Sequence, residues 1–341
     1  MSLAYVLLSI IWFALIAYAA FGGADYGAGL WDLVARGDTA AKQRELIDSA
    51  LGPVWETNHV WLVFLVVGLF SAFPVPFSII CIVLFIPLVV ALIGVVLRGS
   101  AFVFRTHGLR GKNALIWTQV FSASSVLTPF FLGLSAAAVA SGRIRVSPGT
   151  TVQSDLGSIW LTPFTIAIGC MAVSLCATLA SVYLTVEASN KKDHDLAEMY
   201  RRRSLITGAV TAVLGALGLG LSTIYAPLLW QGMLARALPL VIATMLIGLA
   251  TAATLYFRYY RVARALVVGE VAFLLGSWGV SQIPYLIPPD ITVDQGAGPP
   301  STLFLLLIGV CVGMVIILPS IYLLLYLVKL RTGMGFFQKG E

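Results

Sequence analysis

The sequence is poor in charge and in the residues that build reactive centres. Only 11% of its 341 residues are charged and 59% are hydrophobic, whereas ordinary globular chains carry about 25% charged residues. Histidine occurs three times, and only His59 falls in an apolar run. The four cysteines show no CxxC or other metal-like spacing, and no Walker A motif is present. These absences exclude a soluble domain, a zinc site and a P-loop site, and the chain alone shows no redox centre.

Long apolar runs predict an all-α integral membrane protein that forms one polytopic domain over residues 1–341. About 20 apolar residues cross a bilayer, and nine stretches reach that length. The predicted spans are 3–22, 52–73, 77–103, 114–140, 158–186, 204–224, 236–257, 264–285 and 302–328. The first run lacks a basic leader and a cleavage site, so we interpret it as a membrane helix rather than a signal peptide.

Three connecting segments carry their own expectations. Residues 31–50 predict an amphipathic surface helix, and residues 191–203 predict a charged helical connector. Residues 286–301 are rich in proline and glycine, which predicts a loop without regular structure.

The basic residues predict the orientation. All but three of the 21 lysines and arginines fall on one side of the nine-span arrangement, and the exceptions are Arg143, Arg145 and Arg236. The positive-inside rule places the N-terminus outside and the C-terminus in the cytoplasm. The net charge of +6 therefore reflects topology and does not indicate nucleic-acid binding.

A polar cluster in residues 53–62 (PVWETNHVWL) gives the strongest functional signal. Glu56, Asn58 and His59 open an apolar run, and lipid penalises unpaired polar groups. In one interpretation Pro53 occupies the first helical position, so that the helix dipole stabilises Glu56 in the first turn. In the other, Glu56 carries protons or contacts a partner. His59 shares a helical face with Glu56, and a role as metal or haem ligand is the weaker alternative.

A glycine-rich stretch, residues 22–29 (GGADYGAG), places Asp25 at the predicted end of the first span. Glycines allow helices to approach closely or the backbone to turn. Asp25 is either a carboxylate in the interface or an acid at the mouth of a polar path. Arg98 and Arg105, seven residues apart, share one helical face. They either anchor a helix end among lipid headgroups or pair with Asp25 or Glu56.

Glu270 lies in the eighth predicted span, with Ser277 and Ser281 at i+7 and i+11. This thin polar stripe favours a structural glutamate paired with a positive charge.

Four stretches resemble subunit II of the cytochrome bd-type quinol oxidases. Residues 23–29 resemble that family's GFDxGxG, and residues 53–62 resemble its PxWDxNxVWL. Residues 97–105 (LRGSAFVFR) resemble its LRGxxFEFR. Residues 282–288 (QIPYLIP), followed by Thr292 and residues 301–303, resemble its late outer-loop signature. The likeness runs from the first predicted span to the last.

The chain departs from these patterns at three positions. Glu56 stands where the family commonly has aspartate, and Gly22 stands where it often has an acid. Val103 stands where the family often has glutamate.

The resemblance implies two four-helix bundles plus one peripheral helix. It also implies a heterodimer with a subunit I that holds haems of the b and d types. This chain would bind no haem or metal directly, although a quinone or lipid in a structural role is compatible with the family. Small accessory single-span subunits are further expected partners. The complex would oxidise quinol, reduce O2 and separate charge across a bacterial or archaeal cytoplasmic membrane.

On this resemblance the chain buttresses subunit I and helps to line a proton route from the cytoplasm to the oxygen site. The candidates for the route are Asp25, Glu56, Asn58 and His59. The candidates for structural or partner contacts are Trp55, Trp61, Arg98, Arg105 and Glu270. The main alternative is a proton-coupled secondary transporter that uses the membrane carboxylates. A purely structural membrane scaffold is the third interpretation.

Overall fold

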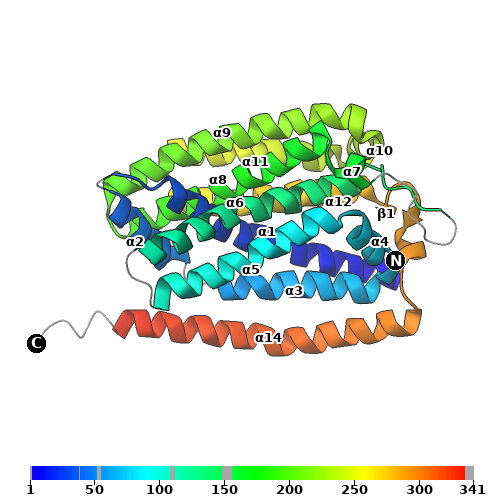
Figure 1. Cartoon of the computed structure of the whole chain (residues 1–341), viewed down its shortest axis with the longest axis horizontal. Helices are drawn as coiled ribbons and strands as arrows, with labels where there is room; N and C mark the ends of the chain where they lie inside the picture. Colours follow the sequence, from blue (N-terminus) through cyan, green and yellow to red (C-terminus); the bar gives the residue numbers. More distant parts are fainter. Residues whose placement is uncertain (1, 38, 52–54, 108–111, 148–155, 335–341) are drawn as a thin grey trace, which may run out of the picture.

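The computed structural model describes residues 2–37, 39–51, 55–107, 112–147 and 156–334. Within these ranges the side chains of Trp55, Glu56 and Arg105 lie outside the described set. The long helices run side by side along the longest axis of the molecule (Figure 1). The apolar runs that predicted membrane spans form these helices.

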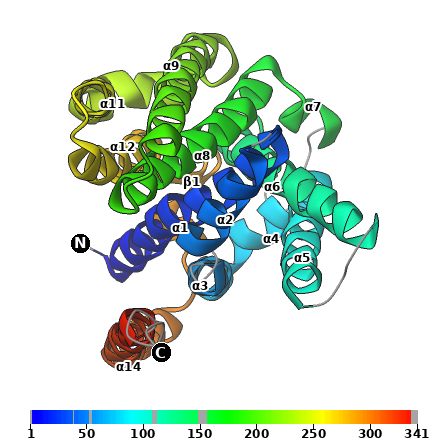
Figure 2. The same ribbon diagram turned by 90° about the vertical axis from the view of Figure 1, so that its left-hand side faces the viewer.

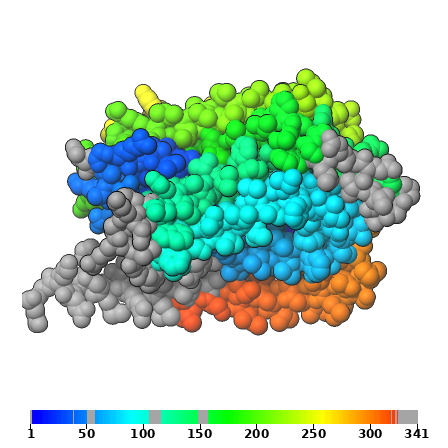
Figure 3. Space-filling view, in the orientation of Figure 1, coloured from blue at the N-terminus to red at the C-terminus, as the bar shows by residue number. Residues whose placement is uncertain are grey.

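The long helices form two groups of four. The first group is α1 (Leu3–Val34), α3 (Trp55–Ala72), α5 (Phe85–His107) and α6 (Lys112–Ala140). The second is α8 (Pro163–Asn190), α9 (His194–Tyr225), α11 (Leu238–Tyr256) and α12 (Tyr260–Gln282). Helix α14 (Pro300–Met334) lies apart from both, beside α3 (Figure 2), and forms one edge of the face in Figure 3. The predicted architecture of two bundles plus a peripheral helix is confirmed.

Short elements close the two ends of the bundles. They are α2 (Ala40–Leu51), α4 (Pro74–Val83), α7 (Leu156–Trp160), α10 (Pro227–Gly232), the π-helical segment η2 (Met233–Ala237), β1 (Tyr285–Ile287), β2 (Ile291–Thr292) and α13 (Val293–Gly296). We call the end that carries α2 and the first turn of α9 the α2 end. The opposite end, with α4, α10 and β1, is the β1 end (Figure 1). The orientation rule predicts that the α2 end faces the cytoplasm.

The span count agrees with the sequence, but some boundaries differ. Eight of the described helices are long and apolar enough to cross a membrane, and the bent pair formed by α3 and α4 would make a ninth. The bend is 117°, and it occurs where Pro74 and Pro76 enter the first turn of α4. The predicted span 77–103 is therefore divided between α4 and α5. The expected surface helix within residues 31–50 is present as α2.

The expectation of an irregular loop over residues 286–301 was wrong. Strand β1 pairs with β2 in an antiparallel arrangement. Helix α13 follows at once, and Thr292 and Gln295 form a capping box at its start. This local capping signal, a threonine followed three residues later by glutamine, outweighs the surrounding prolines and glycines.

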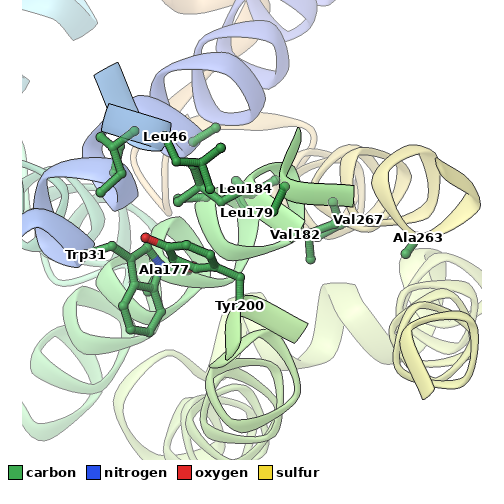
Figure 4. Packing of buried hydrophobic residues seen from close by; sticks show 14 of the residues in the cluster. Trp31, Leu46, Ala177, Leu179, Val182, Leu184, Tyr200, Ala263 and Val267 are labelled. Atoms are coloured by element: carbon green, nitrogen blue, oxygen red, sulfur yellow. Dashed lines mark hydrogen bonds between the residues drawn. The ribbon is translucent and has the colours of Figure 1, made fainter. Parts of the chain in front are cut away.

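The two bundles share a core where α1 packs against α8. Trp31 and Tyr200 meet edge to face, with ring centroids 6.4 Å apart. The Trp31 Nε1 donates a hydrogen bond to the Ala177 carbonyl at 2.9 Å. Leu179 and Leu184 are fully buried beside them (Figure 4). This cluster fixes the position of α1, which carries Asp25, relative to the second bundle.

The glycine-rich stretch does not end the first helix, because α1 continues to Val34. Its glycines instead allow close packing. A Cβ added at Gly27 would lie 1.9 Å from the Cys176 carbonyl oxygen of α8. A Cβ at Gly29 would lie 2.1 Å from Ser125 Oγ of α6. The motif therefore sets the contact of α1 with both neighbours.

Replacing Gly27 by alanine is expected to destabilise the protein, because α1 and α8 must move apart. Overpacking of this kind costs about 1–3 kcal/mol. Gly269→Ala is the matched control, since a Cβ there meets nothing within 4 Å and alanine favours the helix. Thermal unfolding in detergent measures both variants. Equal melting temperatures for Gly27→Ala and wild type would contradict the packing described.

Candidate functional site

A buried ion pair joins α1 to α5. Asp25 and Arg98 are each 5% exposed. Arg98 Nη1 donates to Asp25 Oδ2 at 2.5 Å, and Nη2 donates to Asp25 Oδ1 at 2.8 Å. Nη2 also donates to the Asp25 backbone carbonyl at 2.8 Å. Of the two pairings that the sequence left open for Arg98, the one with Asp25 is present.

Other side chains complete the shell around the guanidinium. Arg98 Nε donates to Ser125 Oγ of α6 at 2.9 Å, so four of the five guanidinium N–H groups have acceptors. The ring centroids of Tyr26 and Phe121 each lie 4.8 Å from the guanidinium carbon Cζ of Arg98. Aromatic faces attract a cation. The site thus stabilises a charge that lipid alone would reject.

Asp25 lies inside the bundle and not at its mouth. It is nine residues before the end of α1, which corresponds to about 14 Å along the helix. Of the two placements that the sequence left open for Asp25, the structure does not show the interface carboxylate at a helix end, because α1 extends past the glycines. Both carboxylate oxygens receive guanidinium hydrogen bonds, so a proton relay through Asp25 would require the ion pair to open.

A small cavity of about 20 Å³ reaches the pair from the α2 end. Its wall includes Asp25 and Arg98, His59 of α3 and Asp48 of α2. Asp48 is exposed, whereas Asp25 is buried. A cavity of this size holds about one water molecule when polar groups line it. The cavity therefore links an exposed acid to the buried pair.

Asn58 is buried between α3 and α1, with 3% exposure. Its Nδ2 donates to the Phe21 carbonyl at 3.3 Å. Its Oδ1 has no partner among the described residues. Buried acceptors are normally satisfied, so this oxygen needs a donor from outside the described residues.

The remaining candidates fall into two groups. The first group has side chains that lie outside the described residues, although the backbone is helical: Trp55, Glu56 and Arg105. The predictions about these three residues stay predictions. Trp61 packs edge to face on Phe13 of α1, with ring centroids 6.1 Å apart. This contact joins α3 to α1.

Glu270 does not have the predicted positively charged partner within the described part of the chain. A Cβ added at Gly248 of α11 would lie 3.0 Å from Glu270 Oε1, so the carboxyl group fits against this glycine. The hydroxyls of Ser277 and Ser281 donate to carbonyls of their own helix. The two serines are therefore satisfied within α12, and the stripe forms no charge network among the described residues.

Sequence reasoning missed several residues of this site. Ser125, Phe121 and Asp48 come from segments without a motif, and only the fold brings them to Arg98. Tyr18 forms a hydroxyl contact of 3.2 Å with Tyr26, although it lies two helical turns earlier. Among these missed residues, only Tyr26 could have been suspected from the sequence, because it directly follows Asp25. No group of three or more metal-ligating side chains was found among the described residues.

A family model described as cytochrome bd terminal oxidase subunit II matches residues 3–328. This chain belongs to that family. Subunit II belongs to a quinol oxidase, a respiratory oxidoreductase, and membership implies a partner subunit I. Membership favours the oxidase interpretation over the transporter.

Individual relatives agree with the assignment. A Bacillus subtilis (strain 168) protein assigned as a cytochrome bd menaquinol oxidase subunit II is 25% identical over 328 residues, covering 94% of this chain and 93% of the relative. The cytochrome bd-I ubiquinol oxidase subunit 2 of Escherichia coli (strain K12) is 25% identical over 193 residues. These residues cover 53% of this chain and 49% of the relative. The structure of bd oxidase from Geobacillus thermodenitrificans matches with a TM-score of 0.76 at 21% identity, covering 96% of this chain and 99% of that one. This last likeness establishes the fold.

Proposed function

We propose that this subunit II buttresses a haem-bearing subunit I and lines the first part of a proton route to the oxygen-reduction site. The observation that carries the proposal is the cavity at the α2 end, which has Asp48, His59 and the Asp25–Arg98 pair in its wall. The haems b and d belong to subunit I in this proposal, and this chain ligates none of them. The complex lies in a bacterial or archaeal cytoplasmic membrane with the α2 end in the cytoplasm.

The ion pair serves as a fixed wall of the route. Arg98 binds three helices together through Asp25 of α1, its own α5 and Ser125 of α6. Breaking such a buried pair by removing one partner costs about 3–5 kcal/mol. A wall of this rigidity holds polar groups in place around water, which a proton route requires.

Glu56 is the proton carrier in this proposal. It lies three residues before His59 on α3, which is the spacing of two positions on one helical face. His59 lines the cavity, and Asn58 Oδ1, which has no partner among the described residues, lies on the same first turns of α3. Water in contact with these groups would connect the α2 end to Glu56.

Subunit I receives the protons at the outer side of α3. Val63, Val67 and Phe70 expose more than half of their surface there. A proton carrier in a membrane helix needs protein cover in this proposal, because lipid offers no hydrogen bonds. Small accessory subunits and a structural quinone or lipid are compatible with the remaining apolar surface.

Gentle purification of the full chain from its native membrane tests the proposal. We expect it to carry a second membrane subunit and to show a reduced-minus-oxidised spectrum of b- and d-type haems. Recovery of a colourless protein without a haem-bearing partner would contradict the oxidase role.

A further inference from the structure

A second cavity lies at the opposite, β1 end, and the proposed proton route does not use it. Its volume is about 250 Å³, below the roughly 300–1,000 Å³ of pockets for drug-sized ligands. Its polar wall comprises Gln231, Arg236, Gln282 and Tyr285, and Leu228 and Leu229 supply an apolar wall. It therefore suits a small polar group attached to apolar chains.

The backbone places Arg236 at the rim of this cavity. Arg236 belongs to η2, where the helix widens to π-helical geometry, and such segments are frequent at functional sites. Its Nη2 donates to the Ser281 carbonyl at the end of α12 at 2.8 Å. A Cβ added at Gly232 would lie 3.0 Å from the same nitrogen. The guanidinium thus lies over a glycine, and most of its donors remain available.

The charge balance of the cavity favours an anion. The cavity wall contains no carboxylate among its described residues. At the same end, Arg145 pairs with Asp290 at 3.2 Å, and Arg143 lies over the Tyr225 ring at 5.2 Å. Arg236 has no such acidic partner within the described ranges. Its planar fork of donors matches phosphate oxygens.

The other polar groups divide into fixed and available ones. Gln282 is fixed, because its Oε1 accepts from Trp278 Nε1 at 2.7 Å and its Nε2 donates to the Leu286 carbonyl at 3.0 Å. The side chains of Gln231 and Tyr285 have no hydrogen bond to another described residue. Their amide and hydroxyl groups can therefore donate to a ligand beside Arg236.

The position of the cavity along the bundle axis matches the level of the lipid headgroups. Helix α11 has 19 residues, about 28 Å of helix, close to the roughly 30 Å hydrocarbon core. Arg236 lies two residues before α11 and bonds the carbonyl of Ser281, one residue before the end of α12, so we infer that it lies at headgroup level. Leu238, Ile242 and Met245 are exposed along the following turns of α11, where acyl chains would lie.

We propose that Arg236, Gln231 and Tyr285 form a binding site for the phosphate group of an anionic membrane phospholipid. The site is independent of the proton route and lies at the other end of the bundle. The same chemistry would accept inorganic phosphate, so the experiment must separate the two sources.

Native mass spectrometry of the complete detergent-solubilised complex, after graded delipidation, tests the site. Phosphatidylglycerol, zwitterionic phosphatidylcholine and inorganic phosphate are added in separate arms. We expect one phosphatidylglycerol to be retained preferentially, and Arg236→Gln to lower its retention about tenfold or more, as expected for losing a charged hydrogen-bond donor. Arg145→Gln is the control, since it removes an arginine at the same end that already has an acidic partner.

A second variant separates binding from a purely structural role of Arg236. Gln231→Ala with Tyr285→Phe leaves the Arg236–Ser281 hydrogen bond in place, so the fold should persist while phosphatidylglycerol retention falls. Unchanged retention in this variant, or an equal loss in Arg145→Gln, would overturn the proposal. Equal binding of inorganic phosphate and phosphatidylglycerol would overturn the assignment to a lipid.

Discussion

Replacing Arg98 by alanine is expected to remove most of the assembled oxidase from the membrane. The substitution leaves the Asp25 carboxylate buried without its guanidinium partner, and it also removes the Nε donor of the hydrogen bond to Ser125 Oγ. Truncating one member of a buried ion pair costs about 3–5 kcal/mol, a large fraction of a typical folding free energy of about 5–15 kcal/mol. Haem content per membrane protein measures assembly, and turnover per haem measures the function of what remains.

Two further variants test whether the uncompensated Asp25 carboxylate causes the loss of assembled oxidase in Arg98→Ala. Arg202→Ala is the control, because its side chain is 73% exposed in a surface pair with Glu198, and such pairs contribute only about 0–1 kcal/mol. Adding Asp25→Asn to Arg98→Ala removes the uncompensated carboxylate and should recover part of the assembly. Haem incorporation equal to wild type in Arg98→Ala would contradict the structural role of the pair.

Replacing Glu56 by glutamine is expected to slow O2 reduction while haem content stays normal. Glutamine preserves the shape and the hydrogen-bonding capacity of the side chain but cannot carry a proton. Positioned proton-transfer groups contribute about 10²–10⁴-fold to rates, so a loss of tenfold or more is expected. Oxygen consumption per haem in purified enzyme provides the measurement.

Matched variants make this result specific. Glu56→Asp keeps the carboxyl group, and the resembling family commonly has aspartate at this position, so turnover should stay near that of wild type. Glu45→Gln removes an exposed carboxylate from α2 and should have no effect. If Glu56→Gln turned over at the wild-type rate, Glu56 would not be the proton carrier.

Much of the fold follows from local patterns in the sequence. Apolar runs of sufficient length locate the long helices, because a helix that crosses lipid must satisfy its backbone internally. The break between α3 and α4 coincides with the gap left between the second and third predicted spans, where Pro74 and Pro76 occur. The arrangement in two bundles came from the family resemblance, since periodicity does not specify which helices pack together.

The candidate site was predictable only in part. Asp25, Arg98, Asn58 and His59 were found because polar residues are conspicuous in apolar segments. The end of α1 was misplaced, because the same glycines can end a helix or allow another helix to approach, and only the contacts at Gly27 and Gly29 decide between them.

Other parts of the site required the three-dimensional structure. Asp48 and Ser125 have no local signal, since their role depends on contacts with distant segments. The absence of a positively charged partner for Glu270 among the described residues likewise depends on how α11 and α12 pack.

The most direct test of the central claim is proton uptake during a single turnover of the oxidase in vesicles. The reduced enzyme is mixed with O2 while a dye reports the pH of the compartment that faces the α2 end. The account predicts that wild-type and Glu56→Asp enzymes take up protons from that compartment, and that Glu56→Gln delays the uptake together with oxygen reduction. Uptake by Glu56→Gln at the wild-type rate, or uptake from the compartment facing the β1 end, would contradict it.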